Sequence, residues 1–273
     1  MKTLPVGLQL YTVRTEMEKG VDAALKAVKA AGYDYVEPAG LFGLSGEEFR
    51  ALLDKNGLKA VCAHVPFASM LSDPDGCIAT YKTIGCEYMA VPYLAEGQRP
   101  GDEGFDKILE SVDAFGAKCA ENGITLLYHN HDFEFKKMPD GRYGLDYMYE
   151  TVSAEHLQTE LDTCWVNVGG ENPTQYIKKY AGRCPVVHLK DFKGSKSEHM
   201  YELIGIESGE KEPVKNTFEF RPVGHGVQDF PAILESAVES GAKYVIVEQD
   251  QTYDLPCLEA AKLSRDYLKS LGW

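Results

Sequence analysis

The feature that most constrains the fold is a regular alternation of short apolar runs with longer amphipathic stretches, which continues along all 273 residues. Apolar runs such as 88–93 have no polar face, which is typical of strands buried on both sides of a parallel sheet. Stretches such as 104–122 have the helical period of apolar residues. The chain contains eight such strand–helix units in order. At roughly 30 residues a unit, this number favours a closed α/β barrel, (β/α)₈, over an open doubly wound sheet.

Each predicted element can be given bounds from its pattern and its end signals. The predicted strands are 6–12, 35–37, 58–65, 88–93, 124–131, 157–163, 184–191 and 244–249. The predicted helices are 21–31, 45–56, 73–85, 104–122, 145–152, 173–180, 230–240 and 255–271. Ser45 followed by Glu48 predicts a capping box at the start of one helix. We therefore expect one barrel domain over residues 1–273, interrupted at about 192–222 by a polar insertion that predicts a lid or a mobile loop.

Composition excludes several classes of function. The net charge is −14 and the 28 Lys and Arg residues are scattered, which argues against a nucleic-acid partner. No apolar run reaches the ~18 residues that span a bilayer, and the first residues do not resemble a signal peptide. The seven cysteines form no CxxC pair, so we expect reduced thiols and a cytoplasmic protein. A small molecule is the expected substrate, and the sequence leaves a homo-oligomer open.

Polar side chains recur where the predicted strands end. These residues are Gln9, Tyr11, Glu37, His64, His129, His131, Asp162, His188, Lys190 and Glu248. The carboxyl ends of barrel strands converge on one face, where active sites form. Burying so many imidazoles and carboxylates together is costly unless a metal or a ligand joins them. Imidazole and carboxylate ligands without cysteine suit a divalent metal with open positions; Mn²⁺ is expected, with Mg²⁺, Co²⁺ and Zn²⁺ as alternatives.

At these residues the chain resembles the xylose-isomerase-like TIM-barrel family. That family includes sugar-phosphate isomerases and epimerases, inosose dehydratases and the AP-endonuclease type of DNA-repair enzyme. The resemblance covers nearly the whole chain, through segments 7–13, 32–37, 63–65, 128–135, 160–163, 187–191, 224–230 and 247–249. Each segment is a weak signal alone, whereas their order and spacing together are fairly specific.

The resemblance implies a metal site built from Glu, Asp, His and a second Glu at successive strand ends. Asp162, His188 and Glu248 match the last three ligands. At the first position many relatives have Glu, and this chain has His129. We expect Glu134, five residues later, to supply the first ligand and His129 to transfer a proton. The alternative is that His129 binds the metal and Glu134 contacts substrate hydroxyls.

The resemblance also implies further roles at the strand ends. His129, Glu248 and Glu134 are the expected catalytic residues, with Glu248 serving both the metal and the proton transfer. The residues expected to contact substrate hydroxyls are His64, His131, Lys190 and Glu37.

The expected chemistry is removal of a proton next to a carbonyl, with a metal as Lewis acid. We therefore predict a sugar isomerase or epimerase, with a dehydratase or lyase acting on an inosose or a 3-keto-glycoside as the alternative. No glycine-rich cradle or basic cluster occurs in the late loops, so a non-phosphorylated substrate fits better. The DNA-repair branch conflicts with the acidic charge. A non-catalytic sugar-binding barrel would have lost ligands such as Asp162.

Overall fold

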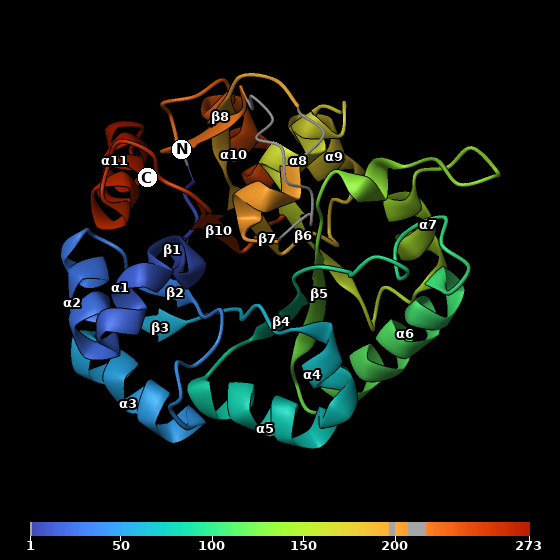
Figure 1. Cartoon of the computed structure of the whole chain (residues 1–273), viewed down its shortest axis with the longest axis horizontal. Coiled ribbons are helices and arrows are strands. Elements are labelled where there is room, and N and C mark those ends of the chain that lie inside the picture. Colours follow the sequence, from blue (N-terminus) through green and yellow to red (C-terminus); the bar gives the residue numbers. More distant parts are fainter. Residues whose placement is uncertain (1, 197–199, 207–216) are drawn as a thin grey trace.

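The computed structural model describes residues 2–196, 200–206 and 217–273, in which helices surround a curled parallel sheet (Figure 1). The sheet order is β3–β2–β1–β10–β7–β6–β5–β4. Its strands are β1 (Val6–Gln9), β2 (Tyr35–Glu37), β3 (Lys59–Ala60), β4 (Tyr88–Val91), β5 (Thr125–His129), β6 (Gln158–Asp162), β7 (Val186–Leu189) and β10 (Tyr244–Val247).

The two ends of this sheet, β3 and β4, meet and close the barrel. Beyond β3 the chain stays extended, and His64 forms parallel bridges with Ala39 and with Ala90. The amide of Val65 donates to the carbonyl of Ala90 (3.1 Å), and the amide of Ala90 donates to the carbonyl of Ala63 (2.8 Å). The predicted (β/α)₈ barrel is confirmed.

The outer ring consists of the amphipathic helices that the sequence predicts. They are α2 (Val21–Ala30), α3 (Gly46–Asn56), α5 (Pro74–Ile84), α6 (Phe105–Glu121), α7 (Gly144–Thr151), α9 (Pro173–Lys179), α10 (Phe230–Glu239) and α11 (Cys257–Ser270). The predicted capping box starts α3: the Glu48 amide donates to Ser45 Oγ (3.2 Å), and the Ser45 amide donates to Glu48 Oε2 (2.8 Å). No helix within the described ranges is long and apolar enough to cross a membrane.

Short helical segments follow several strands, and the sequence reading missed them. They are η1 (Leu10–Val13), α1 (Arg14–Lys19), α4 (Phe67–Ser72), η2 (Phe133–Phe135) and α8 (Thr163–Val168). Two predicted strands therefore end early, because side chains cap the helical turns that follow. Gln9 accepts a hydrogen bond from the Tyr11 amide (2.9 Å), and Asp162 accepts one from the Trp165 amide (2.9 Å).

The predicted insertion begins and ends in an antiparallel ribbon of β8 (Asp191–Lys193) and β9 (Glu219–Arg221). Between them, η3 (Met200–Ile204) lies against the barrel mouth. The Tyr11 hydroxyl donates to the carbonyl of Ile204 (3.0 Å), and the Tyr201 hydroxyl donates to Asp132 Oδ1 (2.5 Å). The rest of the insertion, 197–199 and 207–216, lies outside the described residues. Its role as a lid stays a prediction.

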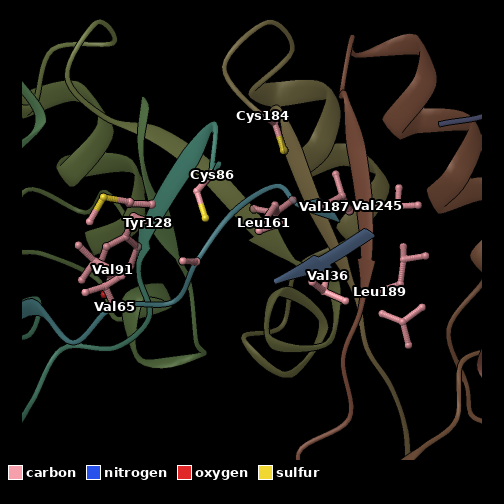
Figure 2. Packing of buried hydrophobic residues seen from close by; sticks show 14 of the residues in the cluster. Val36, Val65, Cys86, Val91, Tyr128, Leu161, Cys184, Val187, Leu189 and Val245 are labelled. Atoms are coloured by element: carbon pink, nitrogen blue, oxygen red, sulfur yellow. The ribbon is translucent and has the colours of Figure 1, made fainter. Parts of the chain in front are cut away.

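Alternation along the strands separates the core from the site. Val187, Leu189 and Val245 belong to the large apolar cluster that contains most of the buried helix residues (Figure 2). Val186 and Ile246 belong to a smaller cluster with Val61 and Cys62, which directly follow β3, and with residues of β4 and β5. Since successive side chains of a strand point to opposite faces, His188 has the same direction as Val186, into the barrel.

Candidate metal centre

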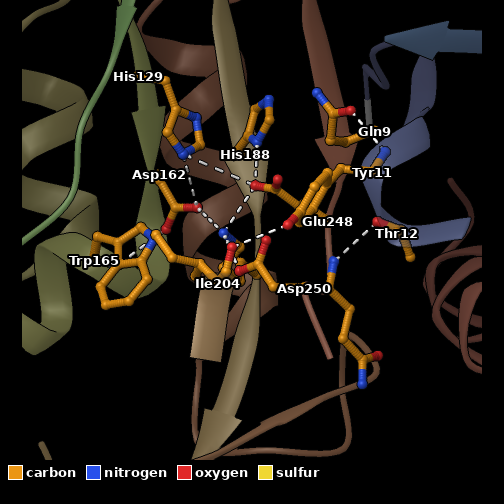
Figure 3. Close-up of polar contacts among 12 residues, drawn as sticks. Gln9, Tyr11, Thr12, His129, Asp162, Trp165, His188, Ile204, Glu248 and Asp250 are labelled. Atoms are coloured by element: carbon orange, nitrogen blue, oxygen red, sulfur yellow. Dashed lines mark hydrogen bonds and ion pairs between the residues drawn. The ribbon is translucent and has the colours of Figure 1, made fainter. Parts of the chain in front are cut away.

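Four buried side chains from four neighbouring strand ends form a compact group. His129, Asp162 and His188 belong to β5, β6 and β7, and Glu248 directly follows β10. One potential ligand atom of each lies within 4.8 Å of those of the others. Figure 3 shows the four side chains directed toward one another at the carboxyl ends of the strands. The parallel barrel brings together residues that are far apart in the sequence.

The distances within this group leave room for a cation. His188 Nδ1 lies 3.0 Å from Glu248 Oε2, whereas His129 Nε2 lies 3.8 Å from Asp162 Oδ2 and 3.9 Å from Glu248 Oε2. Asp162 Oδ2 is buried and has no hydrogen-bond partner within the described part of the chain. Two imidazoles and two carboxylates form a donor set that suits a divalent metal. The residues present therefore fit a metal ion.

Lys190 lies beside this group and is buried as well. Its Nζ is 2.9 Å from Glu248 Oε2, 2.8 Å from Asp250 Oδ2 and 3.3 Å from Asp162 Oδ2. Burial by itself lowers the pKa of Lys190, but Asp162, Asp250 and Glu248 together hold that pKa well above its usual value. Burial raises the pKa of Asp250 to about 6. Lys190 is thus a charged ammonium in the site.

The pKa values of the histidines shift in opposite directions. Burial lowers the pKa of His129 to about 4, with smaller contributions from the neighbouring His188 and His64. Burial also acts to lower the pKa of His188, but the carboxylates of Glu160 and Glu37 outweigh it and hold that pKa well above its usual value. Burial also lowers the pKa of His131, to well below its usual value. Neutral imidazole has a free nitrogen lone pair, which a metal ligand or a general base requires.

A cavity of about 350 Å³ opens beside the four-residue group. Its ionisable lining residues are His64, His129, His131, Lys190, Glu248 and Asp250. Its other lining residues are mainly apolar and include Ala39, Pro66, Pro92, Tyr93, Ile204 and Ile206. A small molecule in this cavity would therefore meet both charged and imidazole groups and carbon surfaces.

Glu134 does not lie in the four-residue group. Its Oε1 accepts a hydrogen bond from the Tyr128 hydroxyl (2.5 Å), and its Oε2 accepts one from the His131 amide (2.8 Å). Tyr128 is part of the large apolar cluster (Figure 2), so this carboxylate lies behind the strand and outside the cavity lining. Burial raises the pKa of Glu134 to about 8. The expectation that Glu134 supplies the first ligand has no support in this geometry, which brings His129 to that position.

The four residues expected to contact substrate separate into two groups. His64, His131 and Lys190 line the cavity. Glu37 is completely buried and does not line the cavity; its Oε2 lies 2.7 Å from His188 Nε2. The structure therefore places Glu37 below the four-residue group, deeper in the barrel.

The sequence reading missed Glu160 and Asp250. Glu160 is completely buried, and its Oε2 lies 2.6 Å from His64 Nε2. Glu160 lies two positions before Asp162 on β6, so its side chain has the same direction, and that spacing was the available signal. Asp250 lies two positions after Glu248, beyond the end of β10, where strand alternation no longer applies.

Comparison with known proteins decides the family. A family model for the xylose isomerase-like TIM barrel matches residues 25–271. The chain belongs to this family. A curated relative, the inosose dehydratase of Geobacillus kaustophilus (strain HTA426), is 24% identical over 92% of this chain and 87% of its own length. A second curated relative, the inosose dehydratase of Clostridium botulinum (strain Alaska E43 / Type E3), is 26% identical over 62% of this chain and 55% of its own length.

Two solved structures show the similarity of the fold. A sugar phosphate isomerase/epimerase from Parabacteroides distasonis ATCC 8503 has a TM-score of 0.76 at 20% identity, covering 99% of this chain and 95% of its own. The IOLI protein, whose structure contains a zinc atom, has a TM-score of 0.72 at 18% identity, covering 98% of each chain.

Proposed function

We propose that this barrel is a divalent-metal-dependent enzyme that removes the proton next to the carbonyl of a non-phosphorylated cyclic keto-polyol and then eliminates water. The observation that carries the proposal is the meeting of His129, Asp162, His188 and Glu248 in one buried group, two members of which, His129 and Glu248, line the cavity. The names of the curated relatives, inosose dehydratases, support elimination as the outcome.

In this proposal His129, Asp162, His188 and Glu248 hold the metal. Mn²⁺ remains the preferred ion, and the zinc atom of the IOLI structure keeps Zn²⁺ as an alternative. A divalent ion there supplies Lewis-acid stabilisation of the negative charge that develops on the substrate oxygen.

Side chains that line the cavity carry out the proton transfers of the reaction. Glu248 accepts the proton from the carbon next to the carbonyl, and the electron pair of the broken C–H bond forms a carbon–carbon double bond. The C–O bond to the neighbouring hydroxyl breaks, and Lys190 donates a proton so that the hydroxyl leaves as water. His64 and His131 hold other hydroxyl groups. No oxidant or reductant is consumed.

The absence of phosphate from the substrate follows from charge. Lys190 is the one Lys or Arg among the described residues that line the cavity, and three carboxylates already surround it. A phosphate group would lack the cationic partners that phosphate sites provide. The apolar walls, in contrast, can contact the C–H faces of a ring.

Isomerisation or epimerisation is the second candidate, because it shares the first proton transfer. The name of the structural neighbour from Parabacteroides distasonis supports it. Return of the proton to a carbon atom, in place of loss of the hydroxyl, would give this outcome.

One experiment tests the proposal and separates the two outcomes. Purified protein is analysed for metal and then incubated in D₂O with a panel of inososes and keto-sugars. Deuterium incorporation reports proton removal, and near-ultraviolet absorbance of a conjugated ketone reports loss of water. Exchange without a conjugated product would favour isomerisation. Absence of metal, or absence of exchange with every ketone in the panel, would overturn the proposal.

A further inference from the structure

Beneath the four-residue group lies a second layer of side chains that the proposed reaction does not use. It contains Glu37 and Glu160, and neither carboxylate has any exposed surface. Glu37 ends β2, and Glu160 precedes Asp162 by two residues on β6. Neither residue lines the cavity, so neither can contact a substrate there.

This inner layer contacts the second nitrogen of both imidazoles in the four-residue group. His188 directs Nδ1 toward Glu248 (3.0 Å) and Nε2 toward Glu37 Oε2 (2.7 Å) and Glu160 Oε2 (3.4 Å). His129 directs Nδ1 toward Glu160 Oε2 (3.3 Å) and Nε2 toward Asp162 and Glu248. Each ring is therefore held between an outer carboxylate and an inner one.

The chemistry of imidazole decides what the inner layer can do. A neutral ring offers one lone pair and keeps a proton on its other nitrogen. When His129 Nε2 and His188 Nδ1 bind one cation, His129 Nδ1 and His188 Nε2 carry protons. The inner carboxylates are the acceptors next to these two nitrogens: Glu160 Oε2 lies 3.3 Å from His129 Nδ1, and Glu37 Oε2 lies 2.7 Å from His188 Nε2. A second cation bound to His129 Nδ1 and His188 Nε2 would require both rings to lose these protons as well.

Glu160 collects a third imidazole, that of His64, whose Nε2 lies 2.6 Å from Glu160 Oε2. Oε1 of Glu160 and both oxygens of Glu37 are buried and form no hydrogen bond within the described residues, and the same holds for His129 Nδ1 and His188 Nε2. These nitrogens are nevertheless close to the inner carboxylates, and Cys62 also lies beside Glu37 and Glu160.

We propose that Glu37 and Glu160 are positioning residues for the metal centre: when the metal is bound, they accept the N–H of the inner nitrogens of His188 and His129, fix each ring in one tautomer and orientation, and so strengthen metal binding. Ligand histidines in metal sites commonly donate to such a carboxylate, and its loss weakens metal affinity about 10–100-fold. This inference rests on the proposed metal centre, but it concerns residues that do not touch the substrate.

The test measures metal binding to metal-free protein. Glu160→Gln and Glu37→Gln keep the size of the side chain and replace one acceptor oxygen by a donor. We expect each variant to bind Zn²⁺ and Co²⁺ about 10–100-fold more weakly than the parent, at an unchanged stoichiometry of one. The visible spectrum of the Co²⁺ form should also shift, because the two rings are oriented differently.

Asp146→Asn is the matched control, since Asp146 is a buried carboxylate that accepts from the Tyr180 hydroxyl and lies on α7, away from the centre. It should leave affinity and spectrum unchanged even if it lowers the melting temperature. His64→Gln should likewise keep one metal per chain. Circular dichroism verifies the fold of each variant, and Glu37→Gln keeps the test decisive if Glu160→Gln does not fold.

The outcomes are separable. Parental affinity and an unchanged Co²⁺ spectrum in both Gln variants would overturn the inference. Two metals in the parent and one in Glu160→Gln or His64→Gln would overturn it in favour of a second cation site. A parent without metal would remove the proposed centre and this inference together. Normal metal binding without proton exchange on any ketone would overturn the proposed function alone.

Discussion

The ammonium group of Lys190 lies 2.9 Å from Oε2 of Glu248, at the wall of the cavity. This pair places a proton donor beside the carboxylate that we propose as the base. An elimination needs both groups on the same small substrate, one for the carbon-bound proton and one for the leaving hydroxyl.

Replacement of Lys190 by Met should separate catalysis from metal binding. Because Lys190 is not a ligand, Lys190→Met should keep its metal, while the rate of dehydration falls by about 10²–10⁴-fold, the usual contribution of a general acid or base. Lys193→Met removes a half-exposed lysine that pairs with Glu219, and it should leave the rate unchanged. Loss of metal from Lys190→Met would contradict this role.

The identity of the first ligand, His129 or Glu134, can be tested with one pair of variants. His129→Ala should lose bound metal, because it removes one nitrogen from the four-residue group. Glu134→Gln should keep full metal occupancy, because both oxygens of Glu134 are engaged by Tyr128 and the His131 amide. Elemental analysis of the purified variants gives the answer, and the reverse pattern would restore Glu134 as the ligand.

Glu134 should also make stability depend on pH. Burial raises the pKa of its carboxyl from 4.5 to about 8 in the folded protein, so the folded state holds this proton more tightly than the unfolded state. The contribution to stability is complete below pH 4.5 and is lost as the pH rises toward 8, by up to about 1.4 kcal/mol per pH unit. Glu134→Gln should therefore gain stability relative to the parent between pH 5 and pH 8 in urea unfolding. A difference that does not vary over this range would contradict the raised pKa.

Removal of the metal should lower the melting temperature. An ion that binds only the folded state at 100 times its Kd contributes about 2.7 kcal/mol, which corresponds to a shift on the order of 5 °C for a chain of this size. Thermal unfolding with a chelator, and again with added Mn²⁺ or Zn²⁺, measures the shift. Asp162→Ala should melt at the same temperature under both conditions. A metal-dependent shift that persists in Asp162→Ala would place the ion elsewhere.

The sequence predicted the fold well because a parallel barrel depends on a repeating pattern. Buried strands and amphipathic helices alternate eight times, and each alternation is visible locally. The short helical turns after the strands were missed, since a single side chain such as Gln9 or Asp162 decides where each strand stops. The closure at His64 is also invisible in sequence, because it joins strands through only a few hydrogen bonds.

The sequence predicted which residues lie at the strand ends of the candidate site, but it did not predict which of them come together as possible metal ligands. Alternation places Asp162 and His188 inside the barrel, and the structure brings them together. It does not tell how the chain turns after β5, and that turn directs Glu134 toward Tyr128 and away from the cavity. The depth of each side chain in the barrel also could not be predicted from the sequence. It separates Glu37, below the four-residue group, from His64, which lines the cavity.

His64 takes part both in the closure of the sheet and in the buried group of imidazoles and carboxylates. Its backbone bridges Ala39 and Ala90 where the ends of the sheet join, and its ring reaches Glu160 at the centre of the barrel. The closure between the two ends of the sheet is therefore connected, through the His64 ring, to Glu160, the carboxylate that also lies beside His129 and His188. A ligand in the cavity that displaces the His64 ring would also strain this closure, so ligand binding and local opening of the barrel are coupled at His64.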